Sequence, residues 1–156
     1  MRIRSRYDRS KLPVWWTQVL LGYGGREVIA DAIIDSGSPI TVVPREIADE
    51  LFDTLGISLP FDGPKIHTAW GELKTSAIPI AVGIEGVGSR QMATIHVVED
   101  RLKDFDFVVV GIGFLDLVEA VLRFGPTRPG ALSDVGARES EPAAMTLFSP
   151  YRVLHW

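Results

Sequence analysis

The chain lacks several features that would point to common protein classes. It has no cysteine in 156 residues, which excludes disulfides and thiolate metal sites. No apolar run reaches the roughly 18 residues of a membrane span, and no apolar region of a secretory signal follows the basic N-terminus. The net charge of −4 argues against nucleic acid, and no two histidines have metal-ligand spacing. We therefore expect a cytoplasmic protein that binds no membrane, nucleic acid, metal or cofactor.

The composition is that of a globular protein, with 46% hydrophobic and 23% charged residues. This length suffices for one domain with a packed core. We expect a basic, loosely ordered N-terminal arm over residues 1–13 and a folded domain over residues 14–125. A flexible linker over residues 126–145, rich in Pro, Gly and Ser, would follow. The apolar segment 146–156 either docks as a strand or is a peptide that the protein itself recognises.

The first half of the folded domain predicts a β-hairpin and one helix. Val14 to Leu21 and Arg26 to Ile34 are rich in β-branched and aromatic residues, and a Gly-rich turn separates them. The second arm leads directly to Asp35. After Pro44, the segment 45–52 has the spacing of an amphipathic helix that covers the sheet. Its apolar face would hold Ile47, Ala48, Leu51 and Phe52.

The second half predicts two more hairpins. The two arms of Lys65 to Val82 meet at Trp70 and Gly71, and Pro79 indicates an edge strand at that point. Residues 90–98 form the return arm of the next hairpin. His96 lies within it, and a lone histidine there is typical of a packed or surface residue.

A buried strand and a short helix are predicted next. Phe105 to Gly111 is nearly all apolar, which is typical of a strand buried on both faces. Asp106 interrupts it and is interpreted as a residue at the start of the strand or on the surface. Phe114 to Ala120 predicts a short helix, and Val121 to Phe124 another strand.

The stretch AIIDSGSPITVVP, from Ala32 to Pro44, carries the most informative motif. A buried strand ends in Asp35, small residues follow, and a second β-branched run begins. A carboxylate in this place is costly unless it is hydrogen-bonded. Ser36, Gly37 and Ser38 offer hydroxyls and backbone N–H groups for that purpose. Taken alone, a D-S-G also fits an ordinary turn whose Asp bonds its own loop.

With its flanks, this motif resembles the active-site loop of the aspartic proteases. FDFVVVGIGFLD, from Phe105 to Asp116, resembles the hydrophobic-hydrophobic-Gly element of their retroviral-like branch, the retropepsins. The order and separation of the two motifs fit one retropepsin protomer over roughly Trp15 to Phe124. The resemblance implies an all-β fold: a single-domain retropepsin-like acid-protease barrel with a flap hairpin and one or two short helices.

The resemblance also implies an activity and a partner. An aspartic endopeptidase needs two carboxylates around one water, and this chain has one such motif. A homodimer would bring Asp35 against Asp35 of a second chain. By resemblance, the Ser36 hydroxyl reaches across the dimer, and Gly37 lets the substrate backbone approach. The Ser38 hydroxyl would donate to the catalytic carboxylate, which predicts an acidic pH optimum.

The substrate implied by the resemblance is an extended peptide or protein held under a flap. Residues 65–75 would be that flap, with Ala69, Trp70 and Gly71 at its tip. An ordinary hairpin with an exposed Trp is the alternative. The subsite candidates favour hydrophobic residues beside the cut bond: Ile40, Val42, Val110, Gly111 and Ile112.

The chain departs from the retroviral pattern at one ion pair. Its positions hold Pro39, Ile40 and Ile112, which leaves dimerisation to apolar contacts and strand pairing. Two other functions stay open. One is a non-catalytic binding or dimerisation module on the same fold, and the other is a small-ligand β-barrel, which predicts a monomer.

Overall fold

The computed structural model describes residues 1–12, 14–68, 71–85, 90–118, 120–122, 145–149 and 152–155. The strands are β1 (Arg2–Ile3), β2 (Trp15–Tyr23), β3 (Arg26–Ile34), β4 (Thr41–Val43), β5 (Ile66–Thr68), β6 (Gly71–Leu73), β7 (Thr75–Ile84), β8 (Gln91–Val98), β9 (Val108–Val110), β10 (Ala120–Leu122), β11 (Met145–Ser149) and β12 (Arg152–His155). The α-helices are α1 (Arg45–Phe52) and α2 (Ile112–Leu117), and short 3₁₀ turns lie at Arg9–Lys11 and Asp53–Leu55.

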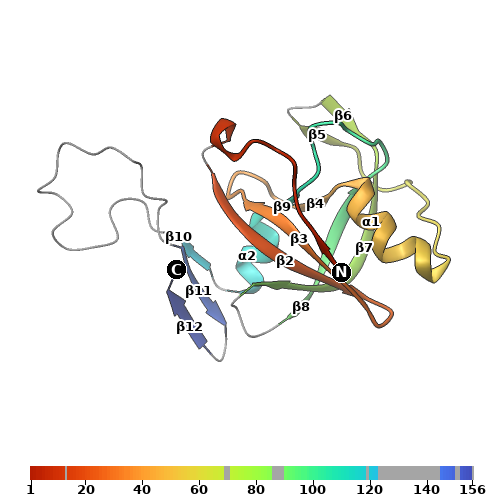
Figure 1. Cartoon of the computed structure of the whole chain (residues 1–156). Helices are drawn as coiled ribbons and strands as arrows, with labels where there is room; N and C mark the ends of the chain where they lie inside the picture. Colours follow the sequence, from red (N-terminus) through yellow and green to blue (C-terminus); the bar gives the residue numbers. More distant parts are fainter. Residues whose placement is uncertain are drawn as a thin grey trace, which may run out of the picture.

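Six strands close into a barrel (Figure 1). Their order is β3-β2-β7-β8-β4-β9, and parallel pairing of β9 with β3 completes the ring. β1 adds to the outside of β3, also in parallel. Closure leaves few exposed strand edges and brings the end of β3 beside the end of β9.

The predicted hairpin of β2 and β3 is confirmed. The two strands pair along their whole length, from Trp15 opposite Ile34 to Tyr23 opposite Arg26. Gly24 and Gly25 make the turn with φ of +54° and +80°, which glycine adopts without steric cost. This long hairpin carries the chain to Asp35.

Apolar side chains form two clusters on opposite faces of the barrel wall. The main core fills the barrel and includes Ala32, Val43 and Val110. The second cluster lies on the other face of the same strands and includes Ile33 and Val109. Strand β9 is a run of three valines that is buried on both faces, as the sequence predicted.

Helix α1 covers the barrel as predicted. It begins directly after Pro44, and its four predicted apolar residues are buried: Ile47, Ala48, Leu51 and Phe52. Gly56 ends the following 3₁₀ turn with φ of +67°, a left-handed conformation that favours glycine. Helix α2 begins at Ile112, two residues before its predicted start.

The N-terminal arm differs from its predicted loose order. Residues 1–12 dock on the barrel through β1 and through two carboxylates of distant segments. Arg9 donates to Asp31 on β3 at 2.8 Å, and Asp31 is 1% exposed. The backbone N–H of Arg6 donates to Asp106 at 2.8 Å. The arm holds because it supplies donors to carboxylates that would otherwise be poorly solvated.

Strand β9 is shorter than the predicted run from Phe105 to Gly111. Phe105 and Phe107 are buried in the second cluster, yet both precede the strand. Between them, Asp106 accepts a hydrogen bond from the Ser5 hydroxyl at 2.5 Å. The N-terminal arm thus docks on this segment through Asp106, which lies two residues before β9 and is partly buried.

Strand β7 has a free edge where Pro79 indicated one. Residues 75–80 pair with β8 alone, residues 81–82 pair with both β8 and β2, and residues 83–84 pair with β2. Beyond α2, strands β10, β11 and β12 form a small antiparallel sheet beside the barrel (Figure 1). Most of the predicted linker lies outside the described residues. In the part of the chain that the structure describes, no helix is long and apolar enough to cross a membrane.

Candidate active site

Asp35 is an exposed carboxylate at the end of a buried strand. Ile34 is 3% exposed, whereas Asp35, Ser36 and Gly37 are exposed. The backbone N–H of Asp35 donates to Val110 at 3.0 Å, and its carbonyl accepts from the Ser38 N–H at 3.1 Å. The Gly37 N–H donates to Oδ1 of Asp35 at 2.9 Å. The loop therefore orients the carboxylate and leaves it open to solvent.

The second predicted motif lies against the first. A Cβ on Gly111 would come within 2.1 Å of the Ile40 carbonyl oxygen, so only glycine fits at this close approach. The Gly111 N–H donates to Oγ1 of Thr41 at 3.2 Å. The Ile112 N–H donates to the Ser38 carbonyl at 2.8 Å. Through these contacts Gly111 and Ile112, which lie far away in sequence, hold the Asp35 loop in place.

The prediction that the Ser38 hydroxyl donates to Asp35 is wrong. The Ser38 hydroxyl donates to the carbonyl oxygen of Ile40 at 2.7 Å, not to Asp35. The hydroxyl thus stabilises the turn into β4, and the Gly37 N–H takes the place of the expected donor. Without a bond from Ser38 to Asp35, the expected acidic pH optimum no longer follows from Ser38. Ser36 is exposed on the loop, which is consistent with its predicted role but does not test it.

A cleft of about 340 Å³ lies between the Asp35 loop and the β5–β6 hairpin. It is bounded on one side by residues 38–40 and 42, and on the other by residues 64–68. The loop side thus begins three residues after Asp35. β8 contributes His96 to this cleft.

The subsite candidates divide into two groups. Ile40 and Val42 line the cleft, whereas Val110 is fully buried in the barrel core and cannot contact a ligand there. Gly111 is buried against the Asp35 loop, and Ile112 is 41% exposed at the start of α2. The prediction of Val110 as a subsite residue is therefore wrong. Side chains alternate along a strand, so Val110 faces the core while its neighbour Val109 faces the second cluster together with Val42.

Two residues of this region were not predicted as site residues, although His96 was expected to be packed or on the surface. Val109 pairs directly with Val42 across β9 and β4, and a run of three valines carries no local signal for which of them faces the core. His96 pairs with Val42 across the parallel β4–β8 ladder. No local signal marks His96, because the ladder joins segments that are far apart in sequence.

The predicted hairpin at residues 65–75 is present as β5 and β6. Ile66 lies opposite Leu73, and Thr68 lies opposite Gly71, whose φ is +105°. The predicted tip residues Ala69 and Trp70 lie outside the described residues. A hydrogen bond joins Lys65 to Glu72 at 2.9 Å near the base, which lowers the pKa of Glu72 and raises the pKa of Lys65.

The described side chains include no group of three or more His, Asp or Glu residues placed to hold a metal ion.

Comparison with known proteins connects this arrangement to a fold. No protein-family model and no curated protein sequence matches the chain. The structure is similar to EIAV protease complexed with the inhibitor HBY-793, with a TM-score of 0.51 and 17% identity over 71% of this chain and 93% of that one. It is also similar to a retropepsin-like aspartic protease from Rickettsia conorii, with a TM-score of 0.52 and 20% identity over 76% and 80%.

These identities are low, so the likeness concerns the arrangement of the chain in space. The closed β-barrel is the feature of this chain that fits the likeness. This chain has the retropepsin-like fold of the aspartic proteases.

Proposed function

We propose that this protein is an aspartic endopeptidase that is active as a homodimer, with Asp35 of each chain in one shared site. One observation carries the proposal: an exposed carboxylate at the end of a buried barrel strand, oriented by the Gly37 N–H. An Asp in an ordinary turn also bonds its own loop, but here the backbone at Gly111 and Ile112 also packs on this loop from a distant part of the sequence. The fold similarity supports the same assignment.

The chemistry needs two such groups. Two carboxylates held close together cannot both ionise cheaply, so the pair shares one proton. The ionised member takes a proton from a water as that water attacks the peptide carbonyl. The protonated member donates to the carbonyl oxygen and stabilises the developing negative charge. Because the pair titrates as a unit, neither role belongs to one chain.

A two-fold axis supplies the second carboxylate. Each chain has a single D-S-G motif, and an isologous dimer places the same loop on both sides of the axis. In this proposal the exposed Ser36 lies at the contact between the two loops. Gly37 has no side chain to hinder the approach of substrate backbone.

The substrate is an extended peptide or protein segment. Its backbone would pair with the strand edges beside the cleft, and its side chains would enter pockets on alternating sides. The β5–β6 hairpin faces the Asp35 loop across the cleft, which supports its role as a flap. On the other side of the cleft, Ile40 and Val42 are the residues proposed to contact substrate side chains.

The Asp35→Asn substitution tests the proposal. We expect casein cleavage to fall by a factor of about 10²–10⁴, because an amide cannot act as an acid or a base. A statine-type inhibitor should block the wild-type protein. Asp104→Asn, at another exposed aspartate, is the matched control and should cleave normally. Sedimentation should show that both variants remain dimers.

Two outcomes would contradict the proposal. One is casein that stays intact with concentrated wild-type dimer across about pH 3–7, the range in which a shared-proton pair of this kind operates. That result favours a non-catalytic module on the same fold. The other is an Asp35→Asn variant that cleaves as fast as the wild type.

A further inference from the structure

His96 is the buried polar side chain of the cleft between the Asp35 loop and the β5–β6 hairpin. It is 9% exposed, and it lies opposite Val42 on the β4–β8 ladder. Its Nδ1 atom is enclosed and has no hydrogen-bond partner. Apolar side chains such as Ile40 and Ile66 make up much of the surrounding wall. An unpaired polar atom in such surroundings costs free energy, so its presence calls for an explanation.

The state of the ring limits what it can bind. Burial lowers the pKa of His96, so the ring is neutral near neutral pH. A neutral imidazole has one N–H donor and one acceptor nitrogen. A half-turn about the Cβ–Cγ bond exchanges Nδ1 with Cδ2 and Nε2 with Cε1, so Nδ1 is not confined to its enclosed position. The suitable partner is a hydrogen-bonding group rather than a fully apolar one.

We propose that His96 is a specificity-determining residue of this cleft, which accepts a substrate side chain with an apolar stem and a carboxamide or carboxyl end. This inference rests on the proposed peptidase function. Glutamine and glutamate have this form: their methylene groups fit the apolar walls, and their terminal oxygens pair with a ring N–H. This proposal replaces the expectation that the subsite accepts only hydrophobic side chains of the substrate.

Discrimination follows from the unpaired nitrogen. Methionine has nearly the length of glutamine, but its end makes no strong hydrogen bond and leaves His96 without a partner. A site that hydrogen-bonds one substrate rejects the analogue that lacks the group, because its own buried polar atom then stays unpaired. We expect a preference of about tenfold in kcat/KM for the hydrogen-bonding side chain over methionine.

Matched peptides test this inference. Sets of three peptides differ only in Gln, Glu or Met, placed in turn at each position near the cut bond. At one position the wild-type protein should cut the Gln or Glu peptide about tenfold faster than the Met peptide. His96→Leu should lose that preference, and Thr94→Val, an exposed change on the same strand, should keep it. The ranking of Gln against Glu distinguishes a carboxamide ligand from a carboxyl ligand.

A Met peptide that is cut equally well at every position overturns the inference, as does a preference that survives in His96→Leu. If His96→Leu does not fold, the preference of the wild-type protein for the Gln or Glu peptide over the Met peptide decides.

Binding of fluorescent peptides to the Asp35→Asn variant separates this inference from the proposed peptidase function. Cleavage without preference contradicts the role of His96 alone. Preferential binding of the Gln or Glu peptide without any cleavage by the wild type supports His96 and contradicts the peptidase function.

Discussion

The backbone N–H of Ile112 donates a 2.8 Å hydrogen bond to the carbonyl oxygen of Ser38. This bond joins the first residue of α2 to the loop of Asp35, across more than seventy residues of sequence. With Gly111 packed on the carbonyl of Ile40, it makes the position of the Asp35 loop depend on strand β9.

Gly111→Ala should displace the Asp35 loop. The new Cβ would lie 2.1 Å from the Ile40 carbonyl oxygen and 2.7 Å from that of Ser38, so backbone must move. We expect the free energy of unfolding to fall by about 3 kcal/mol, measured by urea denaturation. Gly22→Ala is the control, since its Cβ would meet Ala81 at an ordinary 3.5 Å and should change stability by less than about 1 kcal/mol. Equal effects of the two substitutions would contradict the bracing role.

Ile112→Glu should weaken the dimer. Ile112 is 41% exposed beside the Asp35 loop, and a two-fold axis through that loop would bury it against the second chain. A buried, unpaired carboxylate opposes association. We expect a monomer in sedimentation, with loss of cleavage and little change in thermal stability. Met92→Glu, at a more exposed apolar residue of β8, should remain dimeric and active. Dimerisation of Ile112→Glu at wild-type strength would place the interface elsewhere.

Gly71→Ala should impair cleavage if the β5–β6 hairpin is a flap. Gly71 has φ of +105°, a conformation that strains any residue with a Cβ. Gly25, with φ of +80°, lies in the β2–β3 turn at the opposite end of the barrel (Figure 1). Both alanine variants should lose about 1–2 kcal/mol of stability, but only Gly71→Ala should lower kcat/KM, by roughly tenfold. Equal kcat/KM in the two variants would leave the hairpin without a role in substrate binding.

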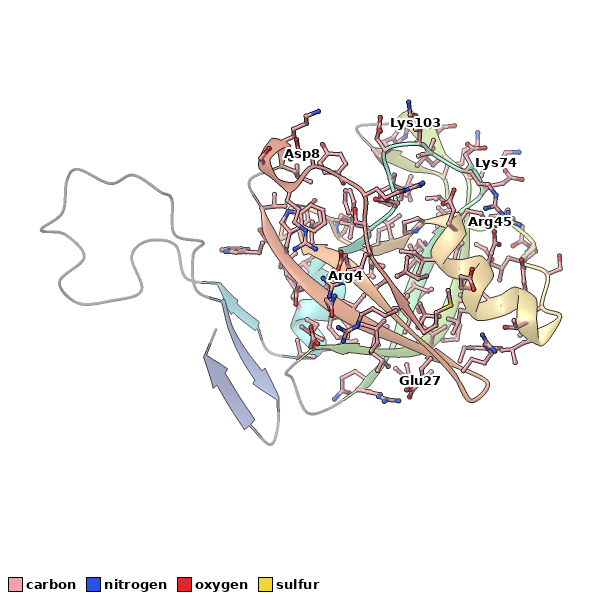
Figure 2. All side chains as sticks on the ribbon, in the orientation of Figure 1. Arg4, Asp8, Glu27, Arg45, Lys74 and Lys103 are labelled. Carbon is pink, nitrogen blue, oxygen red and sulfur yellow. The ribbon has the colours of Figure 1, made fainter. Side chains whose placement is uncertain are left out.

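Arg9→Ala should loosen the N-terminal arm. Arg9 donates to the buried carboxylate of Asp31 at 2.8 Å, and Gln18 donates to it at 2.9 Å. Because Arg9 is half exposed, we expect a loss of about 1–2 kcal/mol in unfolding free energy, less than for a fully buried pair. Arg4, labelled in Figure 2, is exposed on the same arm, and Arg4→Ala should cost less than about 0.5 kcal/mol.

The difference between Arg9→Ala and the wild type should depend on pH. Burial alone would raise the pKa of Asp31, but hydrogen bonds from Gln18, Ser5 and Arg9 outweigh it and lower the pKa. The stabilisation is therefore complete above the unfolded-state pKa of about 3.9, and it is lost as pH falls through the lower folded-state value. Urea denaturation of both proteins at several pH values measures this. A difference that grows in acid would contradict the assignment.

Local pattern predicted much of the fold. The β2–β3 hairpin needed only two apolar runs and a pair of glycines, and α1 needed only its apolar spacing. Both depend on residues that are close in sequence. The resemblance also identified the two motifs that the structure brings together, the Asp35 loop and the strand that ends at Gly111.

Contacts between distant segments were predicted less well. Loose order was expected of the N-terminal arm, yet the arm is held by Asp31 and Asp106, whose partners lie far away in sequence. Val110 was chosen as a subsite residue although alternation turns it into the core. The Ser38 hydroxyl was assigned to Asp35, but the turn into β4 brings the Ile40 carbonyl closer.

The amino-acid sequence by itself determined the local elements and the single acidic loop, since hydrophobic periodicity and turn residues act over a few positions. The tertiary structure alone decided how the barrel closes, which face of β9 meets the core and which distant side chain joins the cleft. Those outcomes depend on strand register, and register is set by the packing of all strands together. His96 reaches the cleft for that reason, since the parallel pairing of β4 and β8 brings it opposite Val42.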